Sequence, residues 1–126
     1  MVKDPVELFV VQNVVLDGLM YPLVYDTIID DVLSSQGGTP VAMLTQFMTD
    51  WFAETKKWSD ATVKIAAAES AENKQILAQW LTEWRDRAAS ALLPVARIAL
   101  GDRTDAVMAD VVQQFNARMA KAGVAI

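Results

Sequence analysis

The pattern of hydrophobic and polar positions predicts a set of helices packed around one apolar segment. That segment, Val6–Leu33, contains few polar residues and no broad polar face, so we expect it at the centre of the fold. A helix should run from about Pro5 to Met20, with Asp4 as its N-cap residue. A second helical piece, Leu23–Leu33, continues the apolar run.

Gly18 and Pro22 interrupt the helix in this apolar segment, which also contains several polar residues. Because proline has no N–H to donate to the carbonyl of Gly18, we expect a kink or break near Tyr21. The stretch Val6–Val24 is long enough to cross a membrane, but charged groups are costly in lipid. The polar residues in question are Glu7, Gln12, Asn13 and Asp17. We therefore expect a cytoplasmic protein with no membrane contact.

Three amphipathic helices should follow the loop Ser34–Gly38. Thr39 is expected to cap the first and Ser70 the second, Gly101 should end the second, and the third should span about Asp105 to Ala122. Each carries an apolar stripe at three-four spacing, which is typical of antiparallel bundle packing. The stripes are Val41, Leu44, Met48, Trp51, Thr55, Trp58, Thr62, Ile65; then Leu77, Leu81, Trp84, Ala88, Ala91, Val95, Ile98; and finally Met108, Val111, Phe115, Met119, Ala122. The whole pattern predicts an all-α antiparallel helical bundle of about four to five helices in one domain, residues 1–126.

Composition excludes several classes of function. The chain of 126 residues contains no histidine and no cysteine, which removes the commonest general base and the thiolate metal sites. The net charge is −5 and the basic residues are scattered along the sequence, so nucleic acid is not expected as a partner. Hydrophobic residues make up 53%, which favours an apolar face covered by a partner over an alanine-rich protein with a generous core.

Three groups of residues are candidate sites. Glu69 and Glu72 have the i, i+3 spacing of two metal ligands on one helix face. Because Ser70 between them looks like a helix break, we interpret them instead as solvated carboxylates at helix ends. Asp17 could be a perturbed buried carboxylate, although pairing with a basic group on a neighbouring helix or chain is favoured. The tryptophans form two pairs at helical spacing and are interpreted as core or interface packing rather than as a ligand box. They are Trp51, Trp58, Trp80 and Trp84.

Charged residues elsewhere are read as local helix features. The spacings Glu54–Lys57 and Asp60–Lys64 suit ion pairs along one helix, and Arg118 suits the C-terminal end of its helix dipole. No catalytic, cofactor-binding or metal-ligating residue is predicted in this chain.

Three stretches resemble the later part of the β subunit of bacterial multicomponent diiron monooxygenase hydroxylases, in the phenol hydroxylase and toluene monooxygenase branch. They are N-V-V-L-D-G-L-M-Y-P-L-V-Y (Asn13–Tyr25), A-T-V-K-I-A-A-A-E-S-A-E-N-K (Ala61–Lys74) and L-L-P-V-A-R-I-A-L-G (Leu92–Gly101). The resemblance implies a ferritin-like or partial ferritin-like fold without iron ligands. It implies a non-catalytic structural subunit that supports assembly with an iron-bearing α subunit, which would hold the diiron centre, and with a γ subunit. A homodimer is a further expectation.

This chain is shorter than the β subunits that it resembles. Family β subunits have a substantial N-terminal portion before the matched part, so this chain is expected to be a fragment, a split gene product or a separately folding half. The alternative hypothesis is a stand-alone helical interaction module that self-associates, with no oxygenase role. A small metal-binding bundle enzyme is the least favoured class.

Overall fold

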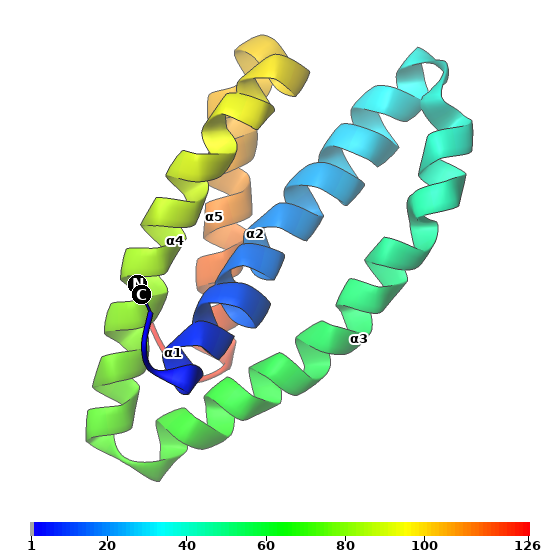
Figure 1. Cartoon of the computed structure of the whole chain (residues 1–126). Coiled ribbons are helices and arrows are strands. Elements are labelled where there is room, and N and C mark those ends of the chain that lie inside the picture. The colour runs from blue at the N-terminus through cyan, green and yellow to red at the C-terminus, as the bar shows by residue number, and fades with distance from the viewer. Residues whose placement is uncertain (1) are drawn as a thin grey trace.

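The computed structural model describes residues 2–126, and every regular element in this range is helical (Figure 1). The all-α prediction is therefore confirmed, with no strand in the described part of the chain. In chain order the elements are α1 (Pro5–Phe9), the π-helix η1 (Val10–Leu16), α2 (Asp17–Tyr21), the π-helix η2 (Pro22–Gly38), α3 (Thr39–Glu69), α4 (Ala71–Leu100), the 3₁₀-helix η3 (Gly101–Arg103) and α5 (Thr104–Lys121).

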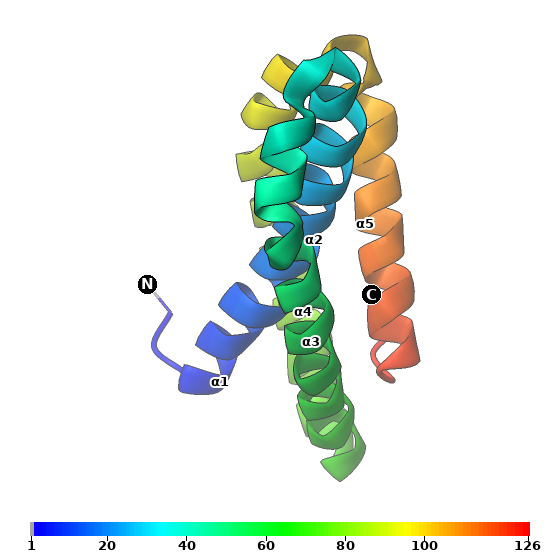
Figure 2. The same cartoon turned by 90° about the vertical axis from the view of Figure 1, so that its right-hand side faces the viewer.

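Successive helical runs reverse direction along the molecule. The first run, from α1 to η2, leads to a tight turn; α3 then returns beside it, α4 runs back, and α5 returns again (Figures 1 and 2). Only α3 and α4 are long α-helices, with 31 and 30 residues, which is fewer than the four to five helices expected. The difference arises because the first run alternates between α and π hydrogen bonding, and because α5 has only 18 residues.

The apolar N-terminal run forms the centre of the core, as expected from its pattern. Its inward residues have at most 1% of their surface exposed, and they pack with buried residues of α4 and α5. These central residues are Val10, Val14, Val15, Leu19 and Leu23. The run begins as predicted, because a carboxylate oxygen of Asp4 accepts hydrogen bonds from the N–H groups of Val6 and Glu7 at 2.7 and 3.3 Å.

The expected break at Tyr21–Pro22 is absent. Tyr21 (φ −62°, ψ −49°) and Pro22 (φ −60°, ψ −40°) both keep helical backbone geometry. The π-helix η2 begins at Pro22, so the missing N–H falls where the hydrogen-bonding pattern changes from α to π. The chain continues through the proline as a helix, so of the expected kink or break, the break is wrong.

The loop predicted at Ser34–Gly38 is real but shorter than expected. Gln36 and Gly37 leave helical geometry inside η2, as does its last residue, Gly38 (φ −83°, ψ 15°), and Gly37 has a φ of +88°, which glycine adopts without strain. Thr39 does not cap α3: it is the first residue of that helix, Gly38 precedes it, and no side chain caps this end. The caps at Ser70 and Gly101 are confirmed. The Ser70 hydroxyl accepts from the N–H of Asn73 at 3.0 Å, and Gly101 ends α4.

The three predicted stripes have different outcomes. All five residues of the α5 stripe are buried. In α4, Leu77 and Leu81 are buried, but Val95 and Ile98 are exposed. In α3 the prediction is wrong: the buried residues are Ser59, Val63 and Ala67, whereas most of the predicted stripe is exposed.

One helical stretch, Pro5–Glu69, contains a window that is long and apolar enough to cross a membrane. The core helix of a soluble protein satisfies the same criterion, and 39% of this window is buried inside the molecule. The expectation of no membrane contact stays a prediction.

Candidate functional site

The two glutamates considered for metal binding lie at a corner between two helices. Glu69 ends α3 and Glu72 lies in the first turn of α4, with the N-cap Ser70 between them. Both are exposed, and a Glu69 carboxylate oxygen accepts a hydrogen bond from the Asn73 side-chain amide at 3.1 Å. Among residues 2–126 the structure shows no cluster of three or more side chains that could hold a metal ion.

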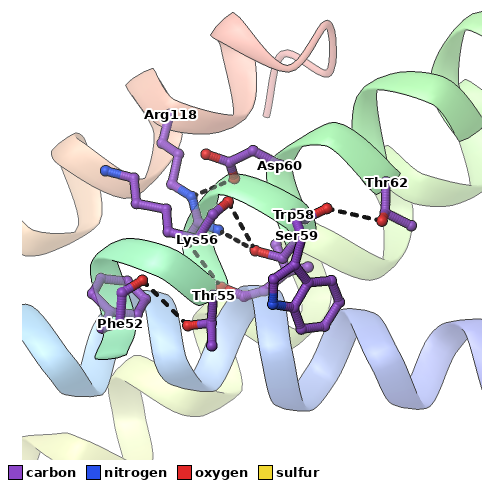
Figure 3. Close-up of polar contacts among 9 residues, drawn as sticks. Phe52, Thr55, Lys56, Trp58, Ser59, Asp60, Thr62 and Arg118 are labelled. Carbon is purple, nitrogen blue, oxygen red and sulfur yellow. Dashed lines mark hydrogen bonds and ion pairs between the residues drawn. The ribbon is translucent and has the colours of Figure 1, made fainter. Parts of the chain in front are cut away.

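A buried arginine connects three helical segments (Figure 3). Arg118 of α5 donates from Nε to a carboxylate oxygen of Asp60 in α3 at 2.6 Å. Its two terminal nitrogens donate to the Ser59 hydroxyl at 3.0 Å and to the Val14 carbonyl of η1 at 3.4 Å. The guanidinium is therefore charge-paired and hydrogen-bonded on three sides, which is what a buried charge requires.

This arrangement corrects the expected charge pairing. Asp60 pairs with Arg118 rather than with Lys64, whereas the Glu54–Lys57 pair forms as expected at 2.6 Å. For Arg118 the sequence pattern predicts only a favourable interaction with the helix dipole. Its spacing from Val111 and Phe115 on the buried stripe is the signal in the sequence that could have shown its inward position.

Gly18 allows the arginine to approach the N-terminal run. A Cβ atom at this position would lie 2.8 Å from a terminal nitrogen of Arg118 and 3.0 Å from two ring carbons of Phe115. Both neighbours are buried, so neither can move freely. Gly18 is thus explained by close packing against α5 and not by helix breaking.

Asp17 lies beside this cluster without an ion pair of its own in the described structure. Burial raises the pKa of its carboxyl, and the nearby positive charge of Arg118 opposes that rise. Pairing with a neighbouring basic group was expected, but Arg118 makes its short contact with Asp60 instead. Burial likewise raises the pKa of Asp26 in η2, against the effect of the hydrogen bond that it accepts from the Thr49 hydroxyl at 3.4 Å.

The tryptophans are not gathered into one site. The Trp84 ring nitrogen donates to a Glu7 carboxylate oxygen at 2.9 Å, which ties α1 to α4. The Trp58 ring lies 5.6 Å from the ring of Phe9. Trp51 has 64% of its surface exposed. The interpretation as core packing therefore fits Trp84, whereas Trp51 lies on a surface that none of residues 2–126 covers, where only the alternative of interface packing remains.

An exposed apolar surface follows α3 and will be called the α3 apolar face. Its residues share one side of the helix, and each has between 47% and 75% of its surface exposed. They are Leu44, Phe47, Trp51 and Trp58, with Met43 beside them. An open groove lies along this side between Phe47 and Trp58 and is bordered by Asp50, Glu54 and Lys57. A large apolar surface with a polar border is typical of an interaction site.

Comparisons with known proteins give the chain a family. A family model described as methane/phenol/alkene hydroxylase matches residues 1–70. The chain is 43% identical over 122 residues to the oxygenase component DmpL of phenol 2-monooxygenase from Pseudomonas sp. (strain CF600), which covers 97% of this chain and 36% of the relative. It is 45% identical over 98 residues to the oxygenase component MhpL from Acinetobacter pittii (strain PHEA-2), covering 78% of this chain and 29% of that protein.

A solved structure agrees with the sequence relatives. The crystal structure of xenon-pressurised phenol hydroxylase from Pseudomonas sp. OX1 contains a chain that matches all of this one at 37% identity and a TM-score of 0.91, over 37% of its own length. The chain thus spans about a third of the proteins it matches. The resemblance to a subunit of phenol-hydroxylase-type multicomponent monooxygenases is confirmed, and the chain belongs to the methane/phenol/alkene hydroxylase family.

Proposed function

We propose that this chain is a non-catalytic structural part of the β subunit of an aromatic-ring-hydroxylating diiron monooxygenase, and that it supports assembly with the iron-bearing α subunit. The observation that carries the proposal is the α3 apolar face, in a chain similar to the oxygenase components of two phenol 2-monooxygenases. A helix that presents aromatic and aliphatic side chains to solvent is suited to packing against another helix.

The rest of the fold is assigned a supporting role. The chain forms one helical domain, residues 1–126, with a ferritin-like or partial ferritin-like arrangement. The central run and the cluster around Arg118 hold α3 against α5, and this support keeps the apolar face in one orientation. The reacting groups and the diiron centre belong to the α subunit, a γ subunit completes the assembly, and the complex is cytoplasmic.

Co-expression with an iron-bearing subunit that carries two Glu-x-x-His motifs tests this proposal. We expect the two chains to co-purify and to elute together in size-exclusion chromatography. The double variant Leu44→Gln, Trp51→Gln should fold normally, because both side chains are largely exposed, but it should fail to co-purify. Far-UV circular dichroism checks folding of the isolated variant.

The matched control is Ile98→Gln on α4, where the side chain has 89% of its surface exposed and lies far from the α3 apolar face in sequence. This variant should assemble like the unmodified chain. If the unmodified chain forms no complex under conditions in which a full-length β subunit assembles, the proposal is wrong.

The same α3 apolar face supports a second candidate function, self-association of a stand-alone helical module. Two copies could bury this face against each other through a two-fold axis. Light scattering of the isolated chain separates the candidates: a concentration-dependent dimer that Leu44→Gln, Trp51→Gln abolishes favours this candidate, and a monomer at all concentrations rejects it.

A further inference from the structure

A second surface, on the side where α3 meets α5, has a different chemistry. Two adjoining grooves share Lys64, Lys121 and Ala122 and run along the boundary of the two helices. Small residues form most of their floor, lysines lie along their rim, and Asp60, Gln114 and Arg118 complete the lining. The small residues are Ala61, Ala67, Ala68, Ala117, Ala122 and Gly123, and the lysines are Lys56, Lys64, Lys74 and Lys121. We call this surface the lysine groove.

The charge of the lysine groove is opposite to that of the whole chain. The chain has 16 acidic residues and a net charge of −5, yet four of its six lysines lie along this one surface. Asp60 is the single acidic residue in the lining, and its carboxylate is already paired with Arg118. The sequence shows these lysines as scattered because they come from three different helices; folding brings them together.

The four ammonium groups are available for a partner. All four lysines are exposed, and none of them forms an ion pair with another described residue. Figure 3 shows the Lys56 side chain beside Arg118, with its ammonium group directed away from the Asp60 carboxylate. Holding like charges together costs free energy, which an acidic partner would recover.

The floor indicates the shape of that partner. Alanine and glycine are small enough for another backbone to approach closely, because the separation of packed helices depends on the side chains at their contact. The groove holds about 420 Å³ beside Asp60 and Gln114 and has no aromatic residue in its lining, so stacking of nucleic-acid bases has no platform there. We propose that the lysine groove binds an acidic helix of a partner protein, with its glutamates or aspartates on the lysine rim.

This inference goes beyond the proposed function, because it concerns a different surface and its test uses no oxygenase subunit. The probe is a fluorescently labelled alanine-based helical peptide of about 20 residues, with glutamates spaced to flank one face, titrated by fluorescence anisotropy. We expect saturable binding that weakens with added salt. The same peptide with glutamine at each glutamate position should bind at least about tenfold more weakly, since several exposed ion pairs act together and each contributes up to about fivefold.

Charge reversal in the protein locates the binding site. The triple variant Lys56→Glu, Lys64→Glu, Lys121→Glu should lose at least about tenfold in affinity for the acidic peptide. The control variant Lys3→Glu, Arg97→Glu, Arg103→Glu changes the net charge equally, but its three positions are exposed and lie outside both grooves. It should keep most of the affinity. Circular dichroism of both variants confirms that they fold.

Three results would overturn the inference. The acidic and glutamine peptides bind equally, the two triple variants lose affinity equally, or a single-stranded DNA oligonucleotide binds as tightly as the acidic peptide and competes with it. The second result would show long-range attraction without a site, and the third would show a polyanion surface. Loss of oxygenase assembly in the α3 variants would leave this measurement unaffected, so each idea fails on its own experiment.

Discussion

The ion pair between Arg118 and Asp60 should respond unequally to loss of either partner. Arg118 has 8% of its side chain exposed and Asp60 has 30%. Asp60→Ala would leave a buried guanidinium with only two neutral acceptors, the Ser59 hydroxyl and the Val14 carbonyl. Arg118→Met would leave a carboxylate that water can reach, while the Ser59 hydroxyl still donates to the Lys56 carbonyl at 3.2 Å.

The expected magnitudes follow from these exposures. Removing one partner of a fully buried ion pair costs about 3–5 kcal/mol. Because Asp60 is partly solvated and the guanidinium would keep two hydrogen bonds, we expect Asp60→Ala to lower the free energy of unfolding by about 2–3 kcal/mol. Arg118→Met keeps a long apolar side chain at this buried position and should lower the free energy of unfolding by about 1 kcal/mol.

Urea unfolding followed by far-UV circular dichroism measures these differences. The matched control is Glu54→Ala, which removes a pair whose side chains are 71% and 73% exposed and should cost less than about 0.5 kcal/mol. If Arg118→Met destabilises as much as Asp60→Ala, or if Asp60→Ala costs no more than Glu54→Ala, the argument that burial of the arginine sets the cost is refuted.

Three further variants test neighbouring contacts by the same unfolding assay. Gly18→Ala should lower the free energy of unfolding by about 1–2 kcal/mol, because its Cβ would press on the Phe115 ring, although alanine favours helices by about 1 kcal/mol. Asp17→Asn should raise the free energy of unfolding at neutral pH. Because burial raises the pKa of Asp17 in the folded state, the ionised carboxylate destabilises the native protein at pH values above 3.8, the ordinary pKa of this carboxyl. The stabilisation by Asp17→Asn should therefore vanish as the pH falls below 3.8. Glu7→Ala removes the acceptor of the Trp84 ring N–H, so we expect a loss of about 1 kcal/mol together with a shift in tryptophan fluorescence, and an unchanged emission spectrum would contradict the contact.

Stripe predictions succeeded where a helix is short and one face meets one neighbour. The α5 stripe is buried throughout its length because α5 spans only 18 residues. In α4 the predicted stripe repeats every seven residues, and on a straight helix such a stripe rotates about 20° around the helix axis per heptad. A stripe that faces the core at Leu77 therefore faces outward at Val95 and Ile98. Pro94 also lies inside this half of α4. The sequence therefore predicted the helix correctly and its buried face for only half its length.

Other errors came from information that a single sequence does not carry. The pairing of Asp60 depends on which helix lies beside α3, and Arg118 is 58 residues further along the chain. The lysine groove has the same origin, because its lysines belong to α3, α4 and α5. The continuous helix through Pro22 depends on a change to π hydrogen bonding that no propensity scale includes.

The error in α3 is the most informative, because the helix buries its small side chains and exposes its large ones. Ser59, Val63 and Ala67 face the core, while Phe47 and Trp51 face outward. Full burial of a large apolar side chain contributes about 1.5–3 kcal/mol, so covering the remaining exposed parts of four such residues would contribute roughly 4–8 kcal/mol. Association costs about 4–15 kcal/mol in lost freedom of motion, so the α3 apolar face alone would give only weak binding. A stable assembly therefore needs a second contact surface, and the lysine groove on the side of α3 that meets α5 offers one with a different chemistry.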